Sequence, residues 1–240
     1  MILLHGFAGT RRAWDGVIAR LPPDVETVAL DLPGHGAKAG ARRPISFEDC
    51  VDDVLAQAPE SFCLCGYSLG GRIALHVALA APERVTRLVL VSSTAGIEEE
   101  SERAQRREAD ERLAEELEGE PFEEFIERWR SQPLFAGEPS AAAERAREDH
   151  RRNRPEALAA VLRGLGSGAM ESLWKRLPEL QMPVDVVVGE RDMKYRELGR
   201  RMLELLPSAQ LVVAPGGHGL PLENPAAVAG VLARPHEEPL

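Results

Sequence analysis

Six short runs of mostly apolar residues recur along the chain, each followed by turn-forming or polar residues. The runs are residues 2–4, 27–30, 62–65, 88–91, 184–188 and 211–213. A strand that is apolar along its whole length is buried on both faces, as parallel strands are when helices cover the sheet. The pattern therefore predicts an α/β fold, a mostly parallel sheet flanked by helices.

Residues 97–173 interrupt this pattern. Acidic and basic residues are dense over 98–112, and no strand-like run occurs before Leu173. We expect consecutive helices here, forming a helical cap of residues 97–173 on a core of residues 1–96 and 174–240. One helix is expected to begin near Pro121, with an apolar face at helical spacing, made of Phe122, Phe125, Ile126 and Trp129. The return to the core is expected to be a glycine-containing loop, either a hinge or an ordinary connection, at Gly164, Gly166 and Gly168.

Composition excludes several classes of protein. The chain has 240 residues and a formal charge of −10, which disfavours binding to nucleic acid and to anionic membrane surfaces. No apolar run approaches the roughly 20 residues of a membrane-spanning helix, and the first residues do not form a leader, so we expect a cytoplasmic protein. Cys50, Cys63 and Cys65 lack the spacing of a disulfide framework or a zinc site, so buried thiols and no metal are expected.

The strongest chemical signal is Gly66-Tyr67-Ser68-Leu69-Gly70, a G-x-S-x-G pentapeptide between an expected strand and an expected helix. In this setting the glycines permit a sharp turn that presents the serine hydroxyl at the carboxyl edge of the sheet. The N-terminus of the following helix then points at any negative charge that develops there. Ser68 is therefore the first candidate catalytic residue.

A serine hydroxyl needs a histidine to take its proton, and the histidine needs a carboxylate to hold its tautomer. Asp192 and His218 each occupy a loop after an expected strand, which completes the chain order Ser68, Asp192, His218. We expect these three residues to form a catalytic triad. The weaker alternatives are Glu190 beside Asp192, Asp185 within its strand, His76 as a packed helix residue and His236 in the C-terminal tail.

The end of the first strand carries His5-Gly6-Phe7. In this position the backbone N–H groups of Phe7 and Leu69 are expected to form an oxyanion hole, two donors that converge on one negative oxygen. His5 and His35 are expected to be structural, because polar loop residues commonly satisfy backbone groups.

Several longer motifs extend these signals over nearly the whole chain. They are HGFAGT (5–10), DLPGHG (31–36), GYSLGGR (66–72), SQPLFA (131–136), GSG with SLW (166–174), GERDMKYREL (189–198) and GGHGLPLENP (216–225). The set resembles the α/β-hydrolase superfamily and, within it, the 2-succinyl-6-hydroxy-2,4-cyclohexadiene-1-carboxylate (SHCHC) synthases of menaquinone biosynthesis. Four elements are specific to that branch. They are Arg72 just after the G-x-S-x-G turn, the QPLFA stretch, the GSG and LW motifs on the way back to the core, and the run from Arg191 to Tyr195.

This resemblance implies an elimination rather than a hydrolysis, with no cofactor. The triad serine would act as a base on a cyclohexene polycarboxylate, from which pyruvate then leaves. Arginine suits such a small-molecule substrate, because its planar guanidinium pairs with carboxylates. Where this sequence matches the family's positions, the resemblance implies Arg72 and Arg106 in anion binding and three further residues in lining the pocket, Tyr67, Trp129 and Lys194.

Two of these assignments have equally simple alternatives. Arg106 lies in a run of both charges that is typical of a solvated helix face. Trp129 has the spacing of the apolar face of its own helix, so it also fits the core of the cap.

The chain departs from the family pattern in three places. His150 stands where the family often has a substrate-binding arginine, and Arg151 and Arg152 follow it, so none of the three is assigned. Pro221 replaces a second histidine. The fold usually begins with a β-hairpin, whereas this sequence begins at the next strand, so either the edge strands are absent or the natural start lies upstream. A truncated edge would expose backbone groups and favour a homo-oligomer.

Two other functions remain open at this point. The same triad equally supports a serine hydrolase, a carboxylesterase or thioesterase that forms an acyl-enzyme. A catalytically silent ligand-binding relative is the third reading. Convergence of Arg72, Arg106 and Lys194 near Ser68 would favour a polyanionic substrate, whereas an apolar pocket would favour ester hydrolysis.

Overall fold

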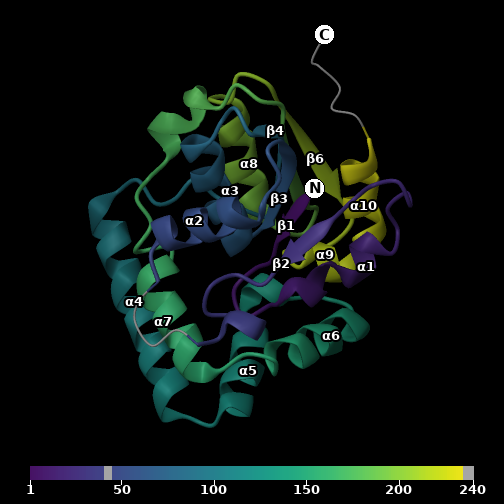
Figure 1. The fold of residues 1–240 in the computed structure, drawn as a ribbon. Helices are drawn as coiled ribbons and strands as arrows, with labels where there is room; N and C mark the ends of the chain where they lie inside the picture. Colours follow the sequence, from purple (N-terminus) through teal and green to yellow (C-terminus); the bar gives the residue numbers. More distant parts are fainter. Residues whose placement is uncertain (41–44, 235–240) are drawn as a thin grey trace.

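The computed structural model describes residues 1–40 and 45–234. In these residues six parallel strands form one sheet in the order β2-β1-β3-β4-β5-β6. The strands are β1 (Ile2–Leu4), β2 (Val28–Leu30), β3 (Phe62–Tyr67), β4 (Val85–Val91), β5 (Val184–Gly189) and β6 (Ala209–Ala214). The expected fold class, a parallel sheet between helices, is confirmed (Figure 1).

Both faces of the sheet are buried along its inner strands, while the edge strands β2 and β6 are partly exposed, at Val28 and Val213 most of all. Alternate residues supply the two faces. In β1, Ile2 and Leu4 enter one apolar cluster, and Leu3 between them enters the other. The first cluster is covered by α2 (Phe47–Gln57), α3 (Leu69–Ala80) and α8 (Met193–Leu203). The second is covered by α1 (Asp15–Ile18), α9 (Leu220–Glu223) and α10 (Pro225–Ala233), on the opposite side (Figure 1). This double burial explains why most strand positions are apolar, the polar exceptions being Thr86 and Arg87 in β4, Asp185 in β5 and Gln210 in β6.

Four helices fill the chain between β4 and β5. They are α4 (Glu100–Gly119), α5 (Phe122–Arg130), α6 (Ser140–His150) and α7 (Pro155–Leu165). We call residues 97–173 the cap segment. Three of its helices, α4, α5 and α7, share a third apolar cluster, made of Ala8, Ala114, Leu117, Phe125, Leu158, Ala159 and Leu162. Because Ala8 follows β1, the cap segment packs against the loop at the carboxyl end of that strand.

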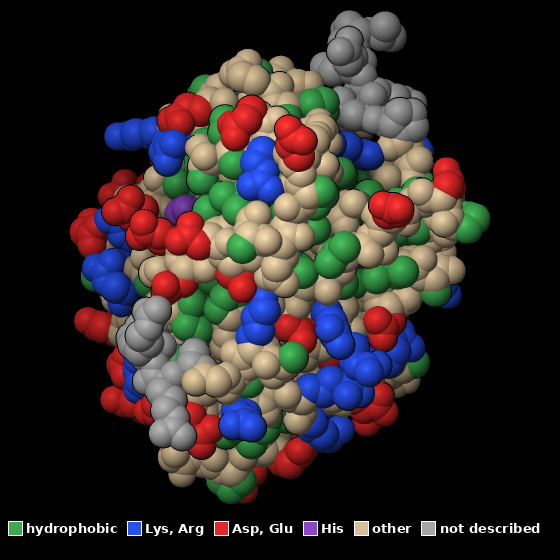
Figure 2. Space-filling view, viewed as in Figure 1, with side chains coloured by type: hydrophobic (Ala, Val, Ile, Leu, Met, Phe, Trp, Pro, Cys, Tyr) green, Lys and Arg blue, Asp and Glu red, His purple; other side chains and the backbone are tan. Residues whose placement is uncertain are grey.

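Charged residues of both signs are interspersed over the surface of the cap helices (Figure 2). Arg163 on α7 pairs with Glu111 and Glu118 on α4, and Arg128 on α5 pairs with Glu116 on α4. Exposed pairs of this kind contribute about 0 to 1 kcal/mol each. They account for the dense charge of this part of the sequence as a solvated face.

Two of the three glycines near the end of the cap segment, Gly166 and Gly168, lie in the expected connection after α7, whereas the expectation that Gly164 lies in it was wrong. Gly164 lies within α7, and a Cβ atom there would come 2.0 Å from the carbonyl oxygen of Ile45. A Cβ at Gly168 would come 2.3 Å from the amide nitrogen of Arg107. These positions are glycine because other backbone segments approach closely, rather than because the chain must flex.

The remaining short elements are 3₁₀ turns. They are η1 (Arg11–Trp14), η2 (Gly36–Lys38), η3 (Pro133–Phe135) and η4 (Trp174–Glu179). The cysteines are free thiols, with Cys50 and Cys65 buried and Cys63 half-buried. Over the part of the chain that is described, no helix is both long and apolar enough to cross a membrane.

Candidate active site

Ser68 occupies a strained turn between β3 and α3. Its φ is +52°, a conformation that is uncommon for a residue with a side chain. The turn is possible because a Cβ at Gly66 would lie 2.2 Å from the carbonyl oxygen of Gly70, and one at Gly70 would lie 2.3 Å from that of Leu4. Only glycine fits at these two places, and the strain keeps the Ser68 hydroxyl free of the strand and the helix.

The three residues of the expected triad meet at the carboxyl edge of the sheet. The Ser68 Oγ atom lies 3.1 Å from His218 Nε2, and His218 Nδ1 lies 2.7 Å from Asp192 Oδ2. An ionised carboxylate only accepts hydrogen bonds, so Nδ1 carries the proton and Nε2 is left to accept from the Ser68 hydroxyl. This arrangement has the geometry needed to take a proton from Ser68.

Glu223 joins the two loops that carry the acid and the histidine. Its carboxylate accepts hydrogen bonds from the N–H groups of Gly217 (2.9 Å) and Gly219 (3.1 Å), on either side of His218. The same carboxylate pairs with Arg191, the residue before Asp192. The side chain of Glu223 is only 2% exposed, so this bridge is shielded from water.

A cavity of about 510 Å³ lies against Ser68 and His218. Among the described residues its lining contains four cationic side chains, Arg72, Arg106, Arg191 and Lys194, and one carboxylate, that of Asp192. A lining of this kind attracts a small molecule with several negative charges.

The cationic side chains differ in what already neutralises them. Arg106 donates to Asp110 at 2.7 Å. Arg72 is buried and donates to the carbonyl oxygen of Leu165 at 2.7 Å, with no carboxylate partner within the described chain. Burial lowers the pKa of Arg72 to about 10, so it keeps its charge at neutral pH. Arg72 and Lys194 are therefore the cations most available to a ligand.

Four more sequence-predicted residues have clear positions. Phe7 and Leu69 line the cavity next to Ser68, as the oxyanion-hole expectation requires. Trp129 lines the cavity too, and its ring packs edge-on against Phe7 with 4.9 Å between ring centroids, so it serves both the cap core and the pocket. Tyr67 does not line the cavity. Its ring lies between Gly6 and His218, 5.6 Å from the His218 ring centroid.

The weaker alternatives of the sequence have other partners. Asp185 accepts from Arg87 and Gln210 within the sheet. His76 stacks on Phe47, and burial lowers its pKa to about 4. Glu190 is exposed, and His236 lies outside the described residues. Asp192 is thus the carboxylate that the fold brings to His218.

None of the three residues left unassigned at the end of α6 lines the cavity. His150 is buried beside the loop after β1, whereas Arg151 pairs with Glu123 on the surface and Arg152 is exposed. The family position normally held by an arginine therefore supplies no cation to the pocket in this chain.

Sequence reasoning missed three features around the cavity. Arg191 lines the cavity. Its place next to Asp192 in the motif was a signal that could have predicted this position. Tyr195 lies 4.6 Å from His218 between ring centroids. A buried ion pair joins Arg130 to Glu138 across the uncharged residues 131–137, a spacing that is not typical of a pair within one helix.

No group of His, Cys, Asp and Glu side chains suited to a metal ion occurs in residues 1–40 and 45–234. The chemistry that the described residues offer is a serine activated by a histidine and a carboxylate, beside a pocket of positive charge.

Comparison with known proteins shows which family and fold the chain shares. A model of the alpha/beta hydrolase family matches residues 1–231. The chain is 34% identical over 239 residues to a 2-succinyl-6-hydroxy-2,4-cyclohexadiene-1-carboxylate synthase from Enterobacter sp., covering 98% of this chain and 90% of that protein. The structure of MenH from S. aureus superposes with a TM-score of 0.91 at 29% identity, covering 96% and 90% of the two chains. A thermophilic esterase from Thermogutta terrifontis, with malate bound, has a TM-score of 0.84 at 25% identity, covering 96% and 86%.

Proposed function

Because the chain belongs to the alpha/beta hydrolase family, we propose that it is a lyase of that fold, an SHCHC synthase. Its reaction would eliminate pyruvate from 2-succinyl-5-enolpyruvyl-6-hydroxy-3-cyclohexene-1-carboxylate, in menaquinone biosynthesis. The proposal is supported by the near full-length similarity to the Enterobacter synthase. The observation that carries it is the cavity, because Arg72, Arg106 and Lys194 line the same cavity as Ser68.

The negative charge of the substrate complements the cationic side chains that line the cavity. The substrate carries one carboxylate on the ring, one at the end of the succinyl chain and one on the enolpyruvyl ether. Arg72 and Lys194 have no carboxylate partner among the described residues, so they are available to these groups. A charge-assisted hydrogen bond to a carboxylate contributes about 1.5–3 kcal/mol when it is shielded from water.

The proton to be removed is the one on ring carbon 2. That carbon is next to the succinyl ketone, so the charge left behind spreads onto the ketone oxygen. We assign Ser68 as the base, with its own proton passing to His218 and Asp192 stabilising the imidazolium that results. The backbone N–H groups of Phe7 and Leu69 would hold the ketone oxygen as its charge grows.

The electrons then move round the ring. The bond from carbon 2 to its hydrogen breaks and a double bond forms between carbons 2 and 3. The former double bond between carbons 3 and 4 shifts to carbons 4 and 5, and the bond from carbon 5 to oxygen breaks. Enolpyruvate leaves with that electron pair and becomes pyruvate on taking up a proton. No electron acceptor is needed, so the triad and the oxyanion hole suffice.

The second candidate is a serine esterase or thioesterase. It is favoured by the similarity to the Thermogutta terrifontis esterase and by the same triad geometry. In that reaction Ser68 would attack the ester carbonyl and form an acyl-enzyme. The two functions differ in substrate charge, because an ester without carboxylates leaves Arg72 and Lys194 unused.

A direct comparison of substrates separates the two functions. Pyruvate release is measured from freshly generated substrate, beside a panel of short-chain nitrophenyl esters and acyl thioesters, with Ser68→Ala protein as the blank. The synthase proposal predicts Ser68-dependent pyruvate release that far exceeds turnover of any ester. Ester or thioester turnover without pyruvate release would replace it by the hydrolase.

A further inference from the structure

The loop of residues 5–10 follows β1 and carries the Phe7 N–H group, and we call it the oxyanion loop. Within it, Ala8 has a φ of +59°. A left-handed conformation costs a residue with a side chain about 1–2 kcal/mol, so it persists only where the surroundings hold it. The contacts of the oxyanion loop therefore show what sets its shape.

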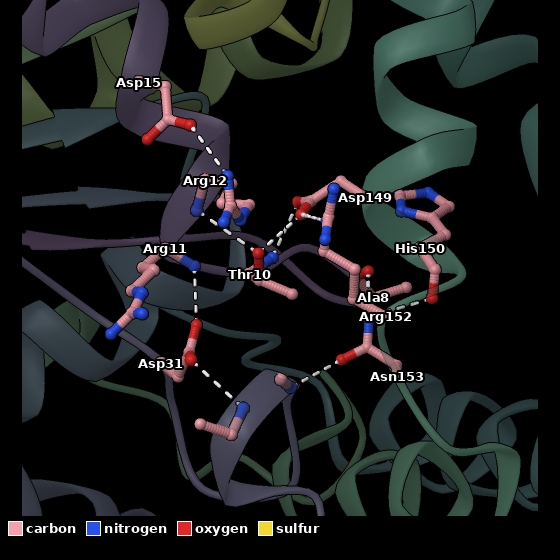
Figure 3. Close-up of polar contacts among 12 residues, drawn as sticks. Ala8, Thr10, Arg11, Arg12, Asp15, Asp31, Asp149, His150, Arg152 and Asn153 are labelled. Carbon is pink, nitrogen blue, oxygen red and sulfur yellow. Dashed lines mark hydrogen bonds and ion pairs between the residues drawn. The ribbon is translucent and has the colours of Figure 1, made fainter.

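Both backbone polar groups of Ala8 are bonded to side chains from distant segments. Its N–H donates to His35 Nε2 at 3.3 Å, and its carbonyl oxygen accepts from Asn153 Nδ2 at 2.6 Å. Asn153 follows α6 and also accepts from the N–H of Gly36 at 2.9 Å (Figure 3). One buried amide, 7% exposed, thus links the oxyanion loop, the end of α6 and the loop at η2.

The hydrogen bonds of Ala8 also fix the orientation of the Phe7 N–H group, because the peptide planes between them are rigid and bonded to one another. The N–H of Gly9 donates to the carbonyl oxygen of Gly6 at 3.1 Å, and His5 Nδ1 lies 2.8 Å from the same oxygen. In a trans peptide the carbonyl and the N–H of the next residue point in opposite directions. Asn153 holds the oxygen of the Ala8–Gly9 peptide, whose N–H holds the oxygen of the Gly6–Phe7 peptide. The direction of the Phe7 N–H follows from this sequence of contacts.

A second side chain from α6 holds the oxyanion loop at its other end. The N–H of Thr10 donates to Asp149 Oδ2 at 2.7 Å, and the Thr10 hydroxyl donates to Asp149 Oδ1 (Figure 3). Asp149 is 6% exposed, so these bonds are shielded from water. Side chains at the end of α6 and just after it therefore bond the oxyanion loop on both sides of Gly9, at Ala8 and at Thr10.

Apolar packing joins the same two parts of the molecule. The side chain of Ala8 is buried in the cluster formed by the cap helices, which includes Phe125 and Leu158. The Phe7 ring packs on Trp129 of α5. The oxyanion loop thus packs against the cap segment and is hydrogen-bonded to it.

We propose that Asn153 and Asp149 are positioning residues. Through their hydrogen bonds, the cap segment sets the direction of the Phe7 N–H group and so completes the oxyanion hole. This inference rests on the proposed function only for the reaction used to read it out. It predicts that loosening the end of α6 slows the chemical step with little effect on the binding of the substrate's carboxylates.

The test uses substitutions that remove the hydrogen-bonding groups of Asn153 and Thr10; the Thr10 hydroxyl also accepts from the N–H of Arg12 at 3.2 Å. Asn153→Ala removes all three bonds of the amide, those with Ala8, Gly36 and the carbonyl oxygen of His150. Asn153→Asp keeps the acceptor for Gly36 and loses the donor to Ala8 and His150. Thr10→Val removes the hydroxyl at nearly constant shape, and Thr10→Ser restores it. Arg147→Gln is the matched control, because it breaks an exposed ion pair between α6 and Glu127 without touching the oxyanion loop.

The first measurement is amide hydrogen exchange of residues 5–10 by mass spectrometry. We expect exchange roughly tenfold faster or more in Asn153→Ala, Asn153→Asp and Thr10→Val than in the wild type, and unchanged exchange in Thr10→Ser and Arg147→Gln. If Asn153→Ala does not fold, the Thr10 pair carries the comparison. Wild-type exchange in both Asn153→Asp and Thr10→Val would overturn the proposal.

The second measurement is the steady-state rate of pyruvate release. Loss of one oxyanion-hole donor lowers kcat by about a hundredfold or more, so misdirecting it is expected to lower kcat roughly tenfold or more in the Asn153 and Thr10→Val variants, with KM changed less than about twofold. A rise in KM at constant kcat would overturn the positioning role. If the wild type releases no pyruvate, the proposed function fails, and the exchange measurement alone decides this inference.

Discussion

Acid sensitivity at His150 offers a quantitative test of the structure. The imidazole lies at the end of α6, only 5% exposed. Burial, with help from the nearby positive charge of Arg130, lowers the pKa of His150 to about 3. The unfolded chain gives a histidine a pKa of about 6.5. Below that pH the unfolded state binds a proton that the folded state does not, so stability falls as the pH falls.

The size of the effect follows from the two pKa values. Linkage over the interval from pH 7 to pH 5, with a folded-state pKa of about 3, gives a loss of about 2 kcal/mol from this one residue. For a domain of this length that corresponds to about 4–8 °C in Tm. His150→Gln removes the titrating group, so its stability should change less between the two pH values by that amount.

The assay is denaturant unfolding of the wild type and of His150→Gln at pH 7 and pH 5. The comparison uses the difference between the two pH values within each protein, so any constant cost of the substitution cancels. His150→Leu repeats the test with an apolar side chain. An equal loss of stability on acidification in the wild type and both variants would refute the reasoning, because His150 would then not be held neutral by burial.

Three further predictions concern the site and its frame. Glu223→Gln places an amide donor against the N–H groups that flank His218, so we expect a stability loss of about 1–3 kcal/mol and a lower kcat, measured by thermal melting and pyruvate release; unchanged values in both would contradict the bridge. Gly164→Ala places a Cβ 2.0 Å from the Ile45 carbonyl oxygen, so Tm should fall despite alanine's better helix propensity, and a rise in Tm would contradict the close contact. Arg72→Gln removes a buried charge from the cavity wall, so KM for the polycarboxylate should rise about tenfold or more, whereas an unchanged KM would remove Arg72 from the binding site.

Local sequence patterns were sufficient for much of the fold and for the triad geometry. The apolar runs predicted the parallel sheet because burial on both faces favours apolar residues, and a buried polar residue such as Asp185 needs partners. Ser68, Asp192 and His218 could be found because each occupies a loop directly after a strand. Parallel strands bring the loops at their carboxyl ends to one edge of the sheet. A residue's position just after a strand is therefore enough to place the three residues at the same edge.

Contacts between distant segments could not be predicted in this way. Asn153 meets Ala8 across 145 positions of the chain, and nothing near either residue marks the other. The glycine at 164 was misread because a close backbone approach and a hinge use the same residue type. The position of His150 was ambiguous for a similar reason, since its burial depends on how α6 meets the oxyanion loop.

The proton on ring carbon 2 tests the central claim most directly. Substrate carrying deuterium at that carbon is freshly generated and turned over by the wild type, with Ser68→Ala protein correcting for spontaneous decay. Elimination with Ser68 as the base predicts a cyclohexadiene product that has lost the deuterium, and slower pyruvate release than from unlabelled substrate. Pyruvate release with the deuterium retained on the ring would mean that the enol ether is hydrolysed, and it would contradict the account.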